Sequence, residues 1–232
     1  RLPFEVSGRL KGGIFCLPGD ISSQYLTGIL LALPLTGGGE IRLLTPLQSR
    51  GYVDMTVSAM RRFGVEVEEG KKRYAVGAES KYASPGELEA EGDWSNAAFW
   101  LCAGALSGPV TVTGLDINSA QGDRAVVDIL QAFGADVKPS PGAVTVSSAE
   151  LRGIEIDAGE IPDLIPVLSV VAAAAKGTTR IYNARRLRLK ESDRLSAIAD
   201  TLERLGADVS EKEDELIIRG GKRFKGGRVS GY

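Results

Sequence analysis

A threefold internal repeat constrains the fold of this chain more than any other feature of its sequence. Phe63-Gly64-Val65 recurs as Phe133-Gly134-Ala135 and again as Leu205-Gly206-Ala207, at intervals of about 70 residues. Three units of this size fill nearly all of the 232 residues. We therefore expect one supersecondary unit, used three times.

Each unit shows the same order of hydrophobic patterns. A short strand and a helix ended by Gly come first; a β-branched strand, an amphipathic helix and a hairpin follow. The predicted first strands are 14–17, 87–91 and 154–156, and the first helices are 22–35, 95–106 and 161–176. The second strands are 40–44, 110–113 and 178–182, and the second helices are 52–63, 121–133 and 190–205. Each unit thus reads βαβαββ, which places the chain in the α/β class.

The composition excludes several kinds of function for this chain. It has no histidine, so it holds no Ser-His-Asp triad, Cys-His dyad or His metal site, and acid–base chemistry falls to Asp, Glu, Lys or Tyr. The net charge of -2 argues against nucleic acid as the main partner. Two cysteines are too few for a disulfide framework, and Cys102 lies in an apolar run typical of a buried thiol in a reducing compartment. No apolar run reaches membrane-spanning length.

Two polar segments of the first unit stand at predicted helix starts. Asp20–Gln24 precedes the first helix, and Ser49–Tyr52 precedes the second, with Arg50 as a further possible anion contact. Hydroxyls beside free backbone N–H groups bind phosphate. The same residue types also cap helices, and this pattern alone favours capping.

One acidic segment opens the most apolar helix of the chain. Asp163 in Glu160–Asp163 is followed at once by Leu164-Ile165-Pro166-Val167-Leu168. Apolar surroundings oppose ionisation of a carboxyl and a helix start favours it, a balance that suits a general base. An ordinary first-turn Asp is the alternative.

The densest charge cluster is Arg185–Arg194, at the start of the last amphipathic helix. Helical spacing would place Glu191 and Lys190 on one face with Arg194. Two cations on one face are typical of a phosphate or carboxylate clamp. A surface salt-bridge network fits the pattern equally well. In the second unit, Asp123 is most simply a helix-start residue, and Glu91–Asp93 a strand end and cap.

Five segments together resemble the 5-enolpyruvylshikimate-3-phosphate synthase family, over essentially the whole chain. The Ser-Ser-Gln and Lys-Glu-Ser-Asp-Arg motifs are specific when they occur together. The segments, in the family's order and spacing, are Pro18–Gln24, Ser49–Asp54, Glu91–Asp93, Ile161–Asp163 and Arg188–Arg194. Arg50-Gly51 replaces a common Lys-Pro, and Arg186 stands where some relatives have Asn, so its role stays open.

This resemblance implies the enolpyruvyl transferase fold, an inside-out α/β barrel in which two lobes each contain three βαβαββ units. Residues 1–88 would form the C-terminal part of one lobe, with one unit, and residues 89–232 part of the second lobe, with two. We expect a partial chain, about half a family member, that starts at Arg1 and stops before a family segment bearing a histidine.

The resemblance also implies a role for each matching residue. Ser22, Ser23 and Ser49 would hold the phosphate of shikimate 3-phosphate, and Gln24 and Tyr52 would line that substrate. Asp163 would accept the proton of the attacking 5-hydroxyl, and Glu191 would handle proton transfer at the enolpyruvyl methylene. Lys190 would bind near shikimate 3-phosphate, and Arg194 would hold the phosphoenolpyruvate carboxylate.

The implied function is enolpyruvyl transfer from phosphoenolpyruvate to shikimate 3-phosphate, with phosphate release, in the shikimate pathway of aromatic amino acid biosynthesis. No metal or organic cofactor is expected, and the partners are these two small molecules rather than nucleic acid or membrane. We expect a cytoplasmic, monomeric parent protein and an inactive 232-residue chain. The alternatives are a UDP-N-acetylglucosamine enolpyruvyl transferase and a non-catalytic repeat module that binds a phosphorylated ligand.

Overall fold

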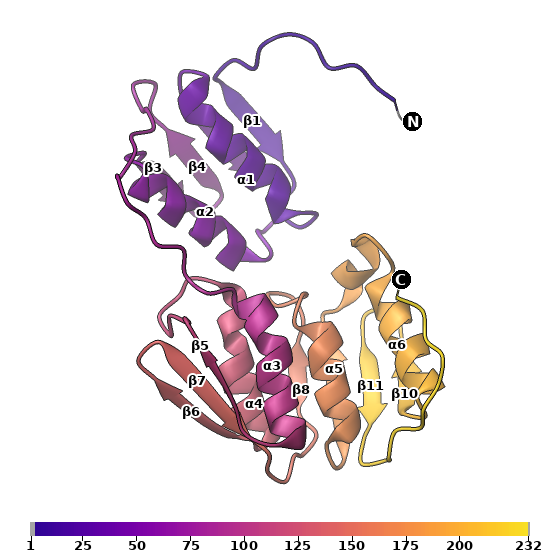
Figure 1. Ribbon diagram of the computed structural model, residues 1–232. Helices are drawn as coiled ribbons and strands as arrows, with labels where there is room; N and C mark the ends of the chain where they lie inside the picture. Colours follow the sequence, from indigo (N-terminus) through magenta and orange to yellow (C-terminus); the bar gives the residue numbers. More distant parts are fainter. Residues whose placement is uncertain (1–2, 232) are drawn as a thin grey trace. The chain divides into compact units, whose positions relative to one another are not determined.

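A computed structural model describes residues 3–231 of the chain (Figure 1). The chain divides into two compact units, Arg1–Leu88 and Glu89–Tyr232. Each unit has its own hydrophobic core. None of the helices between residues 3 and 231 is long and apolar enough to cross a membrane.

The first unit contains one βαβαββ repeat. Its elements are β1 (Ile14–Leu17), α1 (Ser23–Ala32), the 3-10 turn η1 (Leu33–Leu35), β2 (Gly39–Leu43), α2 (Arg50–Arg62), β3 (Val67–Gly70) and β4 (Arg73–Val76). The sheet order is β1-β2-β4-β3, in which only β1 and β2 are parallel. Helices α1 and α2 lie side by side against this sheet (Figure 1) and bury Leu30 and Val57 against Ile41.

The second unit contains two repeats that share one core. Its first repeat has α3 (Trp94–Ser107), β5 (Val110–Thr113), η2 (Gly122–Ala125), α4 (Val126–Phe133), β6 (Asp136–Ser140) and β7 (Ala143–Ser147). Its second has β8 (Glu155–Asp157), α5 (Ile165–Ala174), β9 (Thr178–Tyr182), η3 (Arg185–Leu189), α6 (Arg194–Arg204), β10 (Asp208–Glu211) and β11 (Leu216–Arg219). The sheet orders are β5-β7-β6 and β10-β11-β9-β8, in which only β8 and β9 are parallel.

The prediction of three α/β repeats is confirmed, but the middle repeat lacks its first strand. The predicted strand at 87–91 is wrong, because this segment is exposed and forms no ladder. Gly92, just beyond it, contacts the repeat, where its N–H donates to the carbonyl of Gly114 at 2.9 Å. A Cβ at Gly92 would lie 2.4 Å from that carbonyl oxygen, so the contact requires glycine.

Three helices begin later than predicted. The helix predicted at 121–133 opens with the 3-10 turn η2, and α4 itself begins at Val126. Pro166 has no backbone N–H and is tolerated only in the first turn of a helix, so α5 begins at Ile165 rather than at 161. The carboxylate of Asp193 accepts the N–H of Ser196 at 3.1 Å and caps α6, which begins at Arg194 rather than at 190. The residues before Asp193, among them Lys190, therefore stand in a loop.

Candidate active site

A first group of predicted residues gathers at one edge of the first unit's sheet. Strands β1 and β2 are parallel, so α1 and α2, which follow them, begin at the same edge. Thr45 ties the two loops together, because its hydroxyl donates to Asp20 at 2.7 Å and accepts the N–H of Gly19 at 2.9 Å. Further along, the hydroxyls of Thr27 and Thr56 join the two helices at 2.9 Å.

We call the side chains at these two helix starts the hydroxyl site: Ser22, Ser23, Gln24, Ser49 and Tyr52. Ser22 caps α1 by accepting the N–H of Gln24 at 3.3 Å, and Gln24 is exposed. Ser23 is 8% exposed, and Ser49, at the start of α2, is 2% exposed with a left-handed backbone at φ 53. Tyr52 is half-buried in the first turn of α2. The structure thus brings the two Ser-containing segments to one sheet edge, where all five uncharged side chains stand.

Arg50 is paired with acidic side chains of its own unit. It is the first residue of α2, and its guanidinium pairs with Asp54 at 3.3 Å and with Glu69 at 3.7 Å. Its side chain is 63% exposed. This geometry matches a solvated helix pair.

A second group of predicted residues meets at the equivalent edge of the last repeat. Strands β8 and β9 are parallel, so the loops that follow them lie together. There Asp163 Oδ1 accepts from Arg194 Nη1 at 2.5 Å and lies 3.8 Å from Lys190 Nζ. Arg194 Nη2 donates to Glu191 Oε2 at 2.8 Å. We call these four residues the ionic site.

The ionic site is partly sheltered from water. The side chains of Asp163, Lys190 and Arg194 are 26–30% exposed, whereas Glu191 is 77% exposed. A backbone N–H within residue 191 and then the guanidinium of Arg194 hold the pKa of Glu191 below its ordinary value. The site therefore contains two carboxylates and two cations within ion-pair distance, the set required for proton transfer beside a bound anion.

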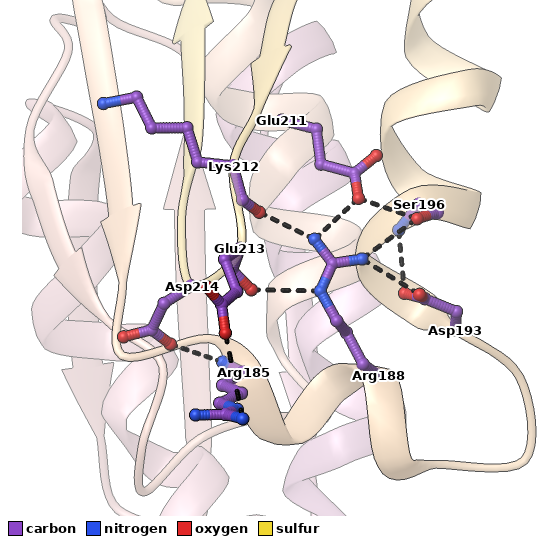
Figure 2. Close-up of polar contacts among 8 residues, drawn as sticks. All are labelled: Arg185, Arg188, Asp193, Ser196, Glu211, Lys212, Glu213 and Asp214. Carbon is purple, nitrogen blue, oxygen red and sulfur yellow. Dashed lines mark hydrogen bonds and ion pairs between the residues drawn. The ribbon is translucent and has the colours of Figure 1, made fainter.

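The predicted charge cluster divides into two parts with different tasks. Figure 2 shows Arg188 enclosed by its neighbours: it donates to the carbonyls of Lys212 and Glu213 at 2.6 and 3.0 Å and pairs with Asp193 and Glu211 at 2.9 and 2.7 Å. Arg188 thus fixes the β10–β11 turn to the start of α6. The salt-bridge interpretation holds for Arg188, whereas Lys190 and Arg194 face Asp163.

The middle repeat contributes a buried carboxyl that the sequence interpretation missed. Asp123 stands in the first turn of η2, so its prediction as a helix-start residue is confirmed, but it caps neither η2 nor α4. It is 2% exposed, and its Oδ2 accepts the hydroxyl of Ser95 in α3 at 2.6 Å. The apolar helix that follows Gln121–Asp123 indicates burial in this part of the chain. Nothing in the spacing of the residues identifies Ser95 as the partner of Asp123. Asp93 caps α3 as expected.

The predicted buried thiol is confirmed. Cys102 in α3 is 1% exposed and unbridged, and burial raises the pKa of its thiol to about 12. Such a thiol is inert as a nucleophile. It therefore belongs to the core of the second unit rather than to its chemistry.

Comparison with known proteins defines first the class of protein and then the family. The fold is that of the enolpyruvyl transferases: the solved enolpyruvyl transferase from Streptomyces tendae superposes with a TM-score of 0.70 at 24% identity, over 92% of this chain and 52% of that one. The family model of EPSP synthase (3-phosphoshikimate 1-carboxyvinyltransferase) matches residues 1–232. The chain belongs to this family.

Individual relatives agree with this assignment. The 3-phosphoshikimate 1-carboxyvinyltransferase of Clostridium acetobutylicum is 46% identical over 100% of this chain and 54% of its own length. That of Methanocorpusculum labreanum is 42% identical over 99% and 54%. The solved EPSP synthase of Acinetobacter baumannii is 30% identical, with a TM-score of 0.77, over 95% of this chain and 53% of that one. The chain spans about half the length of the relatives it matches.

Proposed function

We propose that this chain is part of a protein that transfers the enolpyruvyl group of phosphoenolpyruvate to the 5-hydroxyl of shikimate 3-phosphate and releases phosphate. The family assignment and the names of the curated relatives support this reaction. Asp163 between Arg194 and Lys190 is the observation that carries the proposal. It supplies a base with two cations beside it, as the reaction of an alcohol with an anionic enol phosphate requires.

In this proposal the two sites have different tasks. Ser22, Ser23 and Ser49 bind the phosphate of shikimate 3-phosphate through hydroxyls and helix-start N–H groups, and Gln24 and Tyr52 line that substrate. The helix dipoles favour a phosphate at these helix starts, so binding here does not require a lysine or an arginine.

The ionic site performs the chemistry. Asp163 takes the proton from the 5-hydroxyl while the oxygen of that hydroxyl forms a bond to the enol carbon. Glu191 carries out proton transfer at the methylene carbon. Arg194 binds the phosphoenolpyruvate carboxylate in a two-pronged contact, and Lys190 binds near shikimate 3-phosphate. In the structure Arg194 holds Asp163 and Glu191 instead. The carboxylate of phosphoenolpyruvate would replace Asp163 or Glu191 as a partner of Arg194. The displaced side chain would then be available for proton transfer.

The same proposal covers the lobes, the location and oligomeric state of the protein, and the activity of the chain alone. Arg1–Leu88 is the C-terminal part of one lobe and Glu89–Tyr232 part of the second. The protein acts as a cytoplasmic monomer without a metal or organic cofactor, and the free thiol Cys102 fits a reducing compartment. The 232-residue chain alone is inactive, since it spans about half the length of its relatives.

Phosphate release tests the function. A full-length protein carrying this chain should release phosphate from phosphoenolpyruvate with shikimate 3-phosphate and not with UDP-N-acetylglucosamine. Asp163→Ala and Glu191→Ala should each lower turnover by about 10²–10⁴-fold, the usual contribution of a general acid or base. Turnover that survives both substitutions would show that the catalytic assignment of Asp163 and Glu191 is wrong. No turnover in the unsubstituted full-length protein would favour a non-catalytic binding module, and activity with the nucleotide sugar would favour the other transferase.

A further inference from the structure

Arg188 is enclosed by acceptors from β10, from the turn after β10 and from the start of α6 (Figure 2). The acceptors are the carbonyls of Lys212 (2.6 Å) and Glu213 (3.0 Å), the carboxylates of Asp193 (2.9 Å) and Glu211 (2.7 Å), and the hydroxyl of Ser196 (3.1 Å). A guanidinium has five N–H groups. These five contacts among the described residues therefore use all of its donors inside the repeat, and none is left over for a substrate anion.

Arg188 holds both ends of the short segment 189–193. It precedes this segment directly, and its guanidinium binds Asp193 at the other end. Asp193 uses one carboxylate oxygen for Arg188 and the other for the N–H of Ser196, at 3.1 Å, through which it caps α6. Because Arg188 also binds the β10–β11 turn, the segment and the start of α6 are both fixed to the edge of the sheet.

Three of the four residues of the ionic site lie on segment 189–193 or directly after it. They are Lys190, Glu191 and Arg194. Arg194 is the first residue of α6, and its guanidinium reaches Asp163 at 2.5 Å and Glu191 at 2.8 Å. Lys190 Nζ lies 3.8 Å from the same oxygen of Asp163. The position of the segment therefore sets these three ion-pair distances.

The neighbouring Arg185 shows what an arginine of the same 3-10 turn looks like without this enclosure. Its side chain is 75% exposed and pairs with Glu213 at 3.8 Å, whereas the side chain of Arg188 is 24% exposed. An exposed pair of this kind contributes little to stability or geometry. Sheltered contacts of a planar guanidinium with several acceptors fix its orientation and that of its partners.

We propose that Arg188 is a positioning residue of the ionic site. By holding Asp193 and the β10–β11 turn, it keeps segment 189–193 in the conformation that brings Lys190 and Arg194 to Asp163. Without this hold, the segment would take several conformations, and Arg194 would spend less time on its two carboxylates. The inference deepens the proposed function, but only its kinetic test rests on that function.

A double-mutant cycle in the 232-residue chain tests this coupling without any activity. The two tryptophans, Trp94 and Trp100, both lie in α3, so their fluorescence follows the urea unfolding of the second unit alone. Arg194→Met should lower the unfolding midpoint of the otherwise unsubstituted chain. In an Arg188→Met background, the same substitution should lower the midpoint by less than half as much, whereas independent residues would give equal losses.

Arg185→Met is the matched control, because it removes the same charge from the same turn at an exposed side chain. In this background, Arg194→Met should keep its full effect. Equal effects of Arg194→Met in all backgrounds would overturn the proposal. An equally reduced effect in Arg185→Met and Arg188→Met would overturn it too, because net charge alone would then account for the coupling.

Arg188→Lys decides the question if Arg188→Met does not fold. It keeps the charge but replaces five donors in a planar fork by three donors at one point, which cannot hold the turn and Asp193 together. The effect of Arg194→Met should therefore be reduced in Arg188→Lys as well. A full effect there would show that the charge of residue 188 is sufficient, and the proposal would fail.

A kinetic measurement extends the test to the full-length protein. Arg188→Met should raise KM for phosphoenolpyruvate about tenfold and lower kcat by about 10–10²-fold, because displaced binding and reacting groups are costly. A merely structural role would reduce the amount of folded protein, which lowers the apparent kcat and leaves KM unchanged. An unchanged KM would therefore overturn the positioning role. If the unsubstituted protein turns over no substrate, the proposed function fails, and the double-mutant cycle still decides this inference.

Discussion

The hydroxyl site and the ionic site occupy the same position in two copies of one repeat. In both, two parallel strands deliver two loops to one sheet edge, and a helix follows each loop. The first pair of loops presents hydroxyls, an amide and a phenol, and the second presents two carboxylates and two cations. The repeat therefore fixes where polar groups meet, whereas the individual side chains decide what they do.

This difference separates binding from chemistry. Uncharged groups at a helix start bind an anion without changing their own protonation. Carboxylates paired with Lys and Arg exchange protons and partners, so their state depends on pH, salt and ligand. This contrast can be tested first at the hydrophobic cores that carry the two sites, and then at the polar and charged side chains of the sites.

The largest effect should come from the two cores that carry the sites. Leu30 in α1 and Leu168 in α5 are both 0% exposed on the first helix of their repeats. Leu30→Ala and Leu168→Ala should each cost about 3 kcal/mol, through lost burial and a cavity. Amide hydrogen exchange should show protection falling about 100-fold in the altered unit and little in the other. Equal losses in both units after either substitution would show that the two cores unfold as one.

Much of the scaffold is predictable from the sequence, because the same order of hydrophobic patterns occurs three times. Hydrophobic periods place both helices of the first unit within two residues of their observed starts, and the parallel strand pairs follow from the strand–helix–strand order. The strand at 87–91 is wrong because alternation alone cannot show whether a segment has a pairing partner. Trp94, which follows this segment, is 0% exposed because it is the first residue of α3 and not because a strand precedes it.

The site is predictable only where motif and topology agree. Asp163 and Arg194 are 31 residues apart, and spacing alone does not predict an ion pair between them. The late start of α6 is missed because Asp193 caps it, although Asp193 reads equally well as a helical residue. The burial of Asp123 is missed because its partner Ser95 lies 28 residues away in another helix.

The second prediction breaks the ionic site at its centre. Arg194→Met removes the partner of both Asp163 and Glu191 and leaves Asp163 with Lys190 at 3.8 Å. We expect the free energy of unfolding to fall by about 1–2 kcal/mol at low salt, since this pair is partly sheltered. Chemical denaturation with urea, in low and in roughly 1 M salt, should show a smaller loss at high salt, where charges are screened.

Thr45→Val is the matched change in the loops that carry the hydroxyl site. It removes the two hydrogen bonds that join Asp20 and Gly19 to the second loop. The loss should be about 1–2 kcal/mol, because one of the two hydrogen bonds goes to the carboxylate of Asp20, and should depend less on salt than in Arg194→Met, because no ion pair is broken. A salt-insensitive loss in Arg194→Met would show that packing rather than charge accounts for the ionic site.

The smallest effect should come from acid. The pKa of Glu191 is lowered from its ordinary value of 4.5, so its ionised form stabilises the folded state above that pH. This contribution is present at neutral pH and is lost as the pH falls through the lowered pKa. The backbone amides of residues 190–194 should therefore shift below about pH 4.5. None of the five side chains of the hydroxyl site is acidic, but Asp20 lies two residues before Ser22. In an Asp20→Asn background, the amides of residues 22–24 should therefore keep their positions until the unit unfolds.

Glu40 provides the control for this titration within the first unit. Arg42 and then Arg73 lower the pKa of its carboxyl, so amides of β2 should respond in the same acidic range. A response at β2 without one at residues 22–24 would show that the hydroxyl site is insensitive to protons although its own sheet is not. If residues 22–24 instead titrate together with β2, the loops of the hydroxyl site depend on the ion pairs of the sheet edge beside them, and the division between an uncharged binding site and a charged catalytic site would be less sharp than their side chains indicate.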